Sequence, residues 1–172
     1  MIKLTALLVL LAWTAASAIS AQGPYAPPEA DFSIAFPAAP TVQSRPAHRS
    51  HDVAYRRYVD QEPSRALIVA IDDYPEGSLP PSPDGGVYDK LLRNRAADDQ
   101  AQLMSTKPAR LSGHPSLEGT LVDMNGNVEV VRVLMLGDRL YQLTYVHPDG
   151  ADPAGADAAF FSSFRITPPA TP

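Results

Sequence analysis

The sequence predicts an α+β domain in which an antiparallel β-sheet is flanked by helices. Between residues 117 and 147, three alternating segments are separated by the turn signals Asn125-Gly126 and Gly137-Asp138, and such dipeptides favour tight hairpins. Between Asp84 and Gln100, apolar residues recur at helical spacing. A run of hairpins with helices placed outside it is typical of an antiparallel sheet that carries helices on its faces.

Four segments ahead of the helix have strand character. Residues 31–36 alternate apolar with polar or small side chains, residues 41–45 do so weakly, and residues 52–60 alternate more clearly. Residues 66–71 form a continuous apolar run, which is typical of a central strand covered on both faces.

The predicted helix follows a loop rich in Pro, Gly and Ser, and Asp84 is placed as its N-cap. Residues 103–111 are expected to be a loop leading into a strand, because Pro108 interrupts them. Near the end of the chain, residues 156–162 favour a short helix and residues 163–166 a last strand.

The two turns fix how the three central segments pair, because a two-residue turn sets the register of a hairpin. The first turn would place Gly119 opposite Arg132 and Leu121 opposite Val130. The second turn would place Leu134 opposite Tyr141. This register gathers Arg132 and a set of apolar side chains on one core face, the apolar members being Leu117, Leu121, Val128, Val130, Leu134, Leu136, Tyr141, Leu143 and Tyr145.

The N-terminus has the pattern of a secretory signal peptide. Lys3 precedes the apolar run Leu4–Trp13, and small residues ending at Ala18 or Ala21 form the cleavage site. We therefore expect a signal peptide at 1–21, a flexible lead-in at 22–30, a single α+β domain at 31–167 and a disordered tail at 168–172. The expected location is periplasmic or extracellular, with no integral membrane segment after signal cleavage.

Composition excludes several classes of function. The chain carries 14 Lys and Arg against 19 Asp and Glu, and an acidic domain is a poor match for nucleic acid, which requires clustered positive charge. The absence of cysteine excludes disulfides, thiolate metal sites and cysteine nucleophiles.

Three segments resemble a known family. They are Phe32-Ser-Ile-Ala-Phe-Pro-Ala-Ala-Pro40, Asp138-Arg-Leu-Tyr-Gln-Leu143 and Phe161-Ser-Ser-Phe-Arg-Ile166. In this order and spacing the chain resembles small exported bacterial proteins, mostly uncharacterised, whose fold is like that of PsbP, the lumenal extrinsic subunit of photosystem II. The resemblance implies an antiparallel sheet flanked by helices and a binding or accessory role rather than catalysis.

No motif predicts a catalytic, cofactor-binding or metal-binding residue. Ser50-His51-Asp52 has the residue types of a catalytic triad, but neighbours in an extended chain point to opposite faces. His48 and His51 have a helical spacing in a stretch that is not helical. We therefore expect no cofactor.

A basic stretch in this acidic chain is a candidate partner surface. It comprises Arg45, Arg49, Arg56 and Arg57, together with His48 and His51. Such a stretch serves either as a solvated edge strand that charge protects against sheet extension or as a docking surface for an acidic protein partner in the envelope.

Arg132 is the most informative single residue, because the predicted register buries it. A buried guanidinium needs a partner. Asp99 lies one turn beyond Arg95 on the apolar arc of the helix, so we expect Asp99 to pair with Arg132, with Asp123 as the alternative. A ligand carboxylate or phosphate is the functional alternative for this arginine.

These observations predict an exported binding or accessory protein of the bacterial cell envelope. The alternatives are an extracytoplasmic enzyme such as a hydrolase, with a site that no motif reveals, and a structural component of the envelope.

Export is tested by N-terminal sequencing of the extracytoplasmic protein. We expect a mature chain that begins after Ala18 or Ala21, since small residues there follow the apolar run. A mature chain that still begins at Met1 would contradict the signal peptide.

Overall fold

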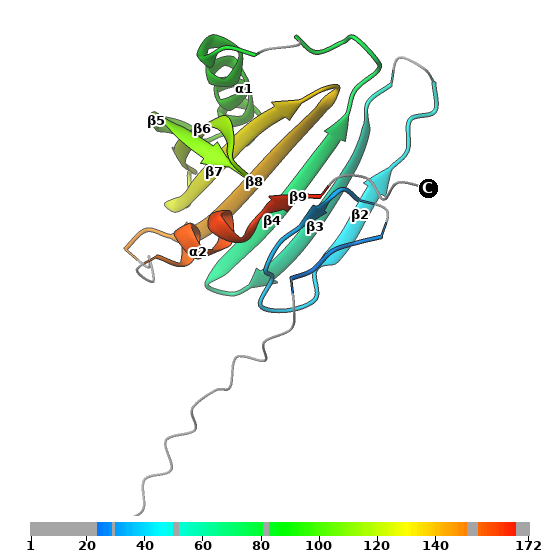
Figure 1. Ribbon diagram of the computed structural model, residues 1–172. Coiled ribbons are helices and arrows are strands. Elements are labelled where there is room, and N and C mark those ends of the chain that lie inside the picture. The colour runs from blue at the N-terminus through cyan, green and yellow to red at the C-terminus, as the bar shows by residue number, and fades with distance from the viewer. Residues whose placement is uncertain (1–23, 29, 50–51, 81–82, 151–154, 168–172) are drawn as a thin grey trace, which may run out of the picture.

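The computed structural model describes residues 24–28, 30–49, 52–80, 83–150 and 155–167. The predicted signal peptide and the predicted tail lie outside these residues. The described chain is an α+β domain of antiparallel strands and two helices, as the sequence predicts (Figure 1). Its elements are β1 (Phe32–Ser33), β2 (Thr41–Arg45), β3 (Ala54–Glu62), β4 (Arg65–Asp73), α1 (Gly85–Asp98), β5 (Gln102–Leu111), β6 (His114–Val122), β7 (Asn127–Leu136), β8 (Arg139–Pro148), α2 (Ala156–Ser163) and β9 (Arg165–Ile166).

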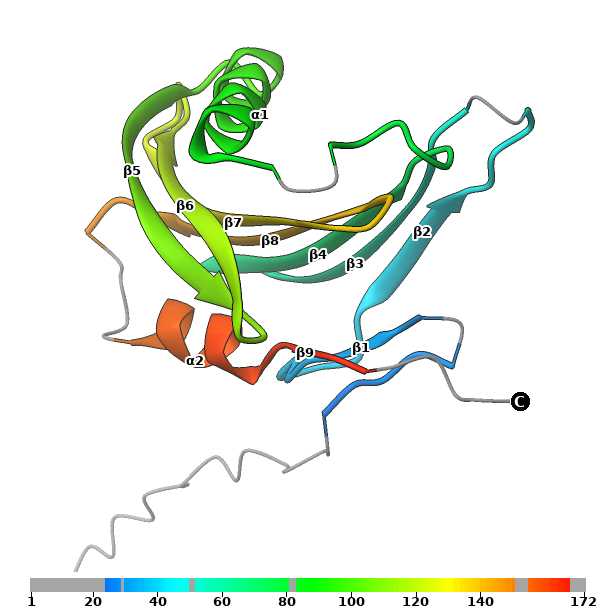
Figure 2. The ribbon, with the colours of Figure 1, turned by 45° about the horizontal axis from the view of Figure 1, so that its top comes forward.

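Seven strands form one antiparallel sheet in the order β2-β3-β4-β8-β7-β6-β5, and β1 pairs separately with β9. The sheet is strongly curved, with α1 on one side and α2, β1 and β9 on the other (Figure 2). We call these two sides the α1 face and the α2 face. Because strand side chains alternate between faces, each strand contributes to both layers.

The α2 face carries the larger core. Aromatic residues of β1 and α2 and of the segments beside them pack on the central strands. Each fully buried apolar side chain contributes roughly 1.5–3 kcal/mol to folding. This core contains Phe32, Ile34, Phe36, Tyr58, Leu67, Val69, Ile71, Leu111, Val130, Leu134, Tyr141, Leu143, Tyr145, Phe160, Phe161 and Phe164.

The α1 face has a second, smaller core beneath the helix. Asp84 caps α1 by accepting a hydrogen bond from Val87 N at 3.0 Å, as predicted. The buried stripe of the helix packs on β6, β7 and β8, and this core contains Tyr88, Leu92, Ala96, Leu121, Val131, Val133, Met135 and Leu140.

The β6–β7 hairpin differs from the predicted one by one residue. Gly126 has φ of 80°, but Asn125 does not have a positive φ, and Gly126 N donates to Asp123 O at 3.1 Å. This is a type I turn followed by a left-handed glycine. The Asp123 carboxylate stabilises it by accepting hydrogen bonds from Asn125 N and Asn127 N, each at 2.8 Å.

The longer turn shifts the register, so that Glu118 pairs with Arg132 and Gly119 with Val131. A shift of one residue moves every side chain of a strand to the other face. Leu117 and Leu121, predicted to share a face with Arg132, therefore lie under α1 instead.

The β7–β8 hairpin matches its prediction. Leu134 pairs with Tyr141 across a two-residue turn. Gly137 has φ of 59° and Asp138 does not have a positive φ, which is the pattern of a type II′ turn.

Residues 102–111 form the full edge strand β5 rather than the predicted loop. An edge strand tolerates Pro108 because the missing N–H can face outwards.

Within the segment expected to be a flexible lead-in, 22–30, the described residue Tyr25 is anchored to the domain. Its main chain pairs with Ile34 in both directions, at 2.8 and 3.0 Å. Its ring packs edge-on against Phe36 and Tyr58.

The turn geometry is tested by Gly126→Ala. A non-glycine residue at a left-handed φ costs about 1 kcal/mol or more, so we expect a lower unfolding midpoint in urea. Gly85→Ala is the matched control, because Gly85 has a negative φ and open space around its Cα. Equal stability of Gly126→Ala and the wild type would contradict this turn.

Candidate functional site

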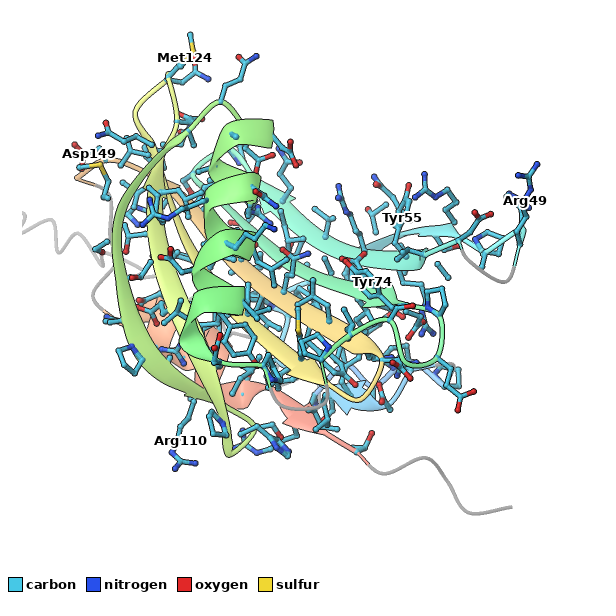
Figure 3. All side chains as sticks on the ribbon, turned by 90° about the horizontal axis from the view of Figure 1, so that it is seen from above. Arg49, Tyr55, Tyr74, Arg110, Met124 and Asp149 are labelled. Atoms are coloured by element: carbon cyan, nitrogen blue, oxygen red, sulfur yellow. The ribbon has the colours of Figure 1, made fainter. Side chains whose placement is uncertain are left out.

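The candidate site is a groove of about 430 Å³ between α1 and the uncovered half of the α1 face. The helix lies over the half of the sheet that contains β5, β6 and β7, so β2, β3 and β4 remain open on this side. Figure 3 looks onto this face and labels Tyr55 and Tyr74 on the part that α1 leaves open. The sheet forms the floor of the groove and α1 forms one wall.

The floor is built by strand alternation. One row across β2, β3, β4 and β8 places Gln43, Arg57, Ala70 and Gln142 side by side. Since Ala70 is the smallest side chain in this row, the floor is hollow at its centre.

The next row contributes Arg45, Tyr55 and Asp72. The guanidinium carbons of Arg45 and Arg57 lie 4.8 and 5.5 Å from the centre of the Tyr55 ring. Cation–π contacts hold both cations without neutralising them, so this end of the floor is positively charged.

Asp72 is the half-buried carboxylate of the floor. Burial raises its pKa, and the hydrogen bond from Gln142 Nε2, at 3.0 Å, and the charge of Arg57 offset only part of that rise. Burial, together with the charge of Asp72, also raises the pKa of Tyr74. A carboxyl group with a raised pKa is protonated over a wider pH range. It can then donate a hydrogen bond to a bound molecule when protonated and accept one when ionised.

The helix wall is mainly acidic. Asp98 and Asp99 line the groove at the C-terminal end of α1. Arg95 lies 3.2 Å from Asp99 Oδ2 and donates to Glu129 at 3.0 Å. Asp99 and Glu129 share the single positive charge of Arg95, so the wall keeps a net negative charge. This acidic wall lies across the groove from the basic end of the floor.

The structure divides the predicted partner surface. Arg45 and Arg57 share the α1 face, but Arg56 points to the α2 face and pairs with Asp73 at 2.9 Å. Arg49 lies in the exposed loop after β2 (Figure 3), where its main-chain N–H donates to Asp52. Of the four arginines, Arg57 therefore lines the groove, and Arg45 lies beside it on the same face.

The predicted pair of Asp99 with Arg132 is wrong. Arg132 lies on the α2 face, and its Nε donates to Glu118 at 2.7 Å. Asp99 belongs to the helix on the opposite face, and the alternative partner, Asp123, stabilises its own turn. The shifted register places Glu118 directly beside Arg132, so an acidic partner comes from the neighbouring strand.

Lys107 is a second partner of Glu118, at 2.8 Å. Burial alone would raise the pKa of Glu118, but hydrogen bonds from Lys107 and Arg132 outweigh burial and hold it below its ordinary value. Glu118 is therefore the shared anion of two cations.

Asp72, Tyr74 and Gln142 were not among the residues predicted for a site. The available signal was the polar ending of the apolar run 66–71, where Asp72, Asp73 and Tyr74 follow directly. Only the pairing of β4 with β8 brings Gln142 to Asp72.

No family model matches the chain, and no curated protein matches it. Among the described residues, no helix has the length and apolar character needed to cross a membrane. The same part of the chain contains no group of three or more His, Cys, Asp and Glu arranged to hold a metal ion.

Asp72→Asn tests the electrostatics of the floor. A raised folded-state pKa means that the folded chain binds a proton more tightly than the unfolded chain, so stability falls as pH rises through that range. We expect the variant to unfold at a higher temperature than the wild type at pH 7, with the difference vanishing near pH 3. A variant that is less stable at pH 7 would show that Arg57 and Gln142 outweigh burial.

Proposed function

We propose that this chain is an exported binding protein of the bacterial cell envelope, with a PsbP-like fold and a signal peptide at 1–21, and that it holds a small polar ligand in the groove. The order of elements, the family resemblance of the three segments and the pattern of residues 1–21 support the class and the location.

The groove itself carries the binding proposal. Its volume of about 430 Å³ falls in the usual range of small-molecule sites, roughly 300–1,000 Å³. A helix centred on the sheet would have filled this space with apolar side chains. The half-covered face instead exposes polar side chains around the small Ala70.

The charges of the groove indicate the ligand class. Arg57, with Arg45 beside the groove, favours an anionic group over the floor, and Asp98 and Asp99 favour a cationic group beside the helix. A ligand that carries both charges can pair with both sides of the groove. An apolar ligand would displace water from the charged side chains without offering them hydrogen bonds, which is unfavourable. Amino acids and short peptides have this chemistry.

The lining residues also distinguish binding from nucleophilic catalysis. None of them is Ser, Thr, Cys, His or Lys, so the groove lacks the usual nucleophile-and-base pair. One observation favours the alternative, an extracytoplasmic hydrolase: Asp72, with its raised pKa, lines the same groove as Asp98 and Asp99. Carboxylates in different environments can divide the roles of general acid and general base.

Ala70→Leu tests the groove by filling its floor. Amino acids and dipeptides that carry both charges should raise the melting temperature of the wild type, since a ligand at 100 times its Kd stabilises by about 2.7 kcal/mol. Ala70→Leu should lose this response. Ala66→Leu is the matched control, because Ala66 lies on the same face of β4 outside the groove.

An equal response of Ala70→Leu and the wild type would contradict the site, and no response of the wild type to any compound of this class would contradict the ligand. Mass spectrometry of the same incubations separates the two functions. Binding leaves the compounds intact, whereas a hydrolase releases products and loses that activity in Asp72→Asn.

A further inference from the structure

A second hollow lies on the α2 face, at the end of the molecule opposite β2. It has a volume of about 450 Å³ and lies between the β5–β6 turn and the C-terminal end of α2. Figure 2 shows these two segments side by side, and Figure 3 labels Arg110 near the turn. Its lining is Arg110, Ser112, Gly113, Arg132, Phe161, Ser162 and Arg165.

Three arginines and no carboxylate line this hollow, although acidic residues outnumber basic ones in the chain. Among the described residues, Arg110 and Arg165 make no ion pair, in contrast to Arg56, Arg93 and Arg139. Glu118, which pairs with Arg132, is shared with Lys107. Glu118 is therefore shared by two cations, Arg110 and Arg165 have no carboxylate partner among the described residues, and the hollow keeps a surplus of positive charge.

Arg110 and Arg165 are held in place by carbonyl oxygens, which do not neutralise them, whereas Arg132 pairs with Glu118. Arg110 Nη1 donates to Gly113 O at 2.5 Å, and Arg165 Nη1 donates to Ser162 O at 2.5 Å and to Phe164 O at 2.8 Å. The guanidinium of Arg132 lies 4.4 Å from the centre of the Phe161 ring. In the described part of the chain, the Nη2 group of none of the three donates a hydrogen bond.

The polar rim adds a neutral donor. Ser112 Oγ accepts a hydrogen bond from Ile166 N at 2.9 Å, so the hydroxyl proton is available for a further acceptor. This serine occupies a left-handed conformation, with φ of 50°, and the bond from Ile166 fixes it against β9. The site thus combines fixed guanidinium groups with a fixed hydroxyl.

We propose that this hollow binds a phosphate-bearing anion. Several guanidinium groups suit a multiply charged tetrahedral anion, because the Nη2 group of each can donate a charge-assisted hydrogen bond to one of its oxygens. The fixed positions reduce the entropy lost on binding. The site is independent of the groove, since it lies on the opposite face and shares no lining residue with it.

Calorimetric titration of the full mature chain with inorganic phosphate and with pyrophosphate, at constant ionic strength, tests the proposal. The double variant Arg110→Gln/Arg165→Gln should bind at least tenfold more weakly than the wild type. Both side chains are exposed and make no ion pair, so the fold should persist, and circular dichroism checks this. Arg93→Gln is the control, an exposed arginine on α1 outside the hollow, and it should bind like the wild type.

The source of the phosphate is distinguished by co-sedimentation with phosphatidylcholine vesicles, with and without phosphatidic acid. Sedimentation that requires phosphatidic acid and is lost in the double variant indicates a lipid headgroup. Binding of phosphate or pyrophosphate without such sedimentation indicates a free phosphorylated molecule. The proposal is overturned if the wild type binds none of these probes, or if the double variant binds them as tightly as the wild type.

Discussion

The contact between Leu92 of α1 and Gly119 of β6 determines how this domain is arranged. A Cβ atom at position 119 would lie 2.9 Å from a methyl carbon of Leu92, so any larger residue there would force the Leu92 side chain to shift. Tyr88, one turn earlier, fixes the same helix by accepting a hydrogen bond from Met135 N at 3.1 Å. Because α1 is held over β6 and β7, it cannot also cover β2, β3 and β4. The smaller core and the open groove are therefore two results of one packing contact.

Local sequence patterns predicted most of the helices and strands. The main error, the register of β6 against β7, came from leaving the Asp123 side chain out of the turn prediction. The strands other than β5, the helix with its Asp84 cap and the β7–β8 register follow from alternation, helical period and turn type. Asn125-Gly126 alone indicates a two-residue turn. In the structure, Asp123 accepts hydrogen bonds from two main-chain N–H groups and stabilises a turn that is one residue longer. The resulting shift exchanged the faces of β6, and with them the partner of Arg132. One carboxylate outside the turn dipeptide was sufficient to change this prediction.

The candidate site was less accessible to sequence reasoning, because its residues come from strands that are distant in the chain. Alternation along residues 52–60 does separate Arg56 from Arg57, since neighbours in a strand face opposite ways. The meeting of Gln43, Arg57, Ala70 and Gln142 depends on strand order, in which β8 inserts between β4 and β7. Nor does any local pattern reveal how much of a sheet face a helix will leave open. That depends on where a small residue such as Gly119 allows the helix to approach.

The pairing of β1 with β9 has a consequence for how the domain is completed. Phe32 pairs with Ile166, so the first strand of the domain finds its partner only in the last. Contacts so distant in sequence form slowly, because a long loop must close before they are made. The aromatic core of the α2 face, which contains Phe32 and Phe164 stacked on one another, is then closed only when the end of the chain arrives. Until its last residues have left the ribosome, the chain would leave one face of its sheet uncovered, with Tyr58 and Tyr141 exposed to proteins that bind unfolded chains.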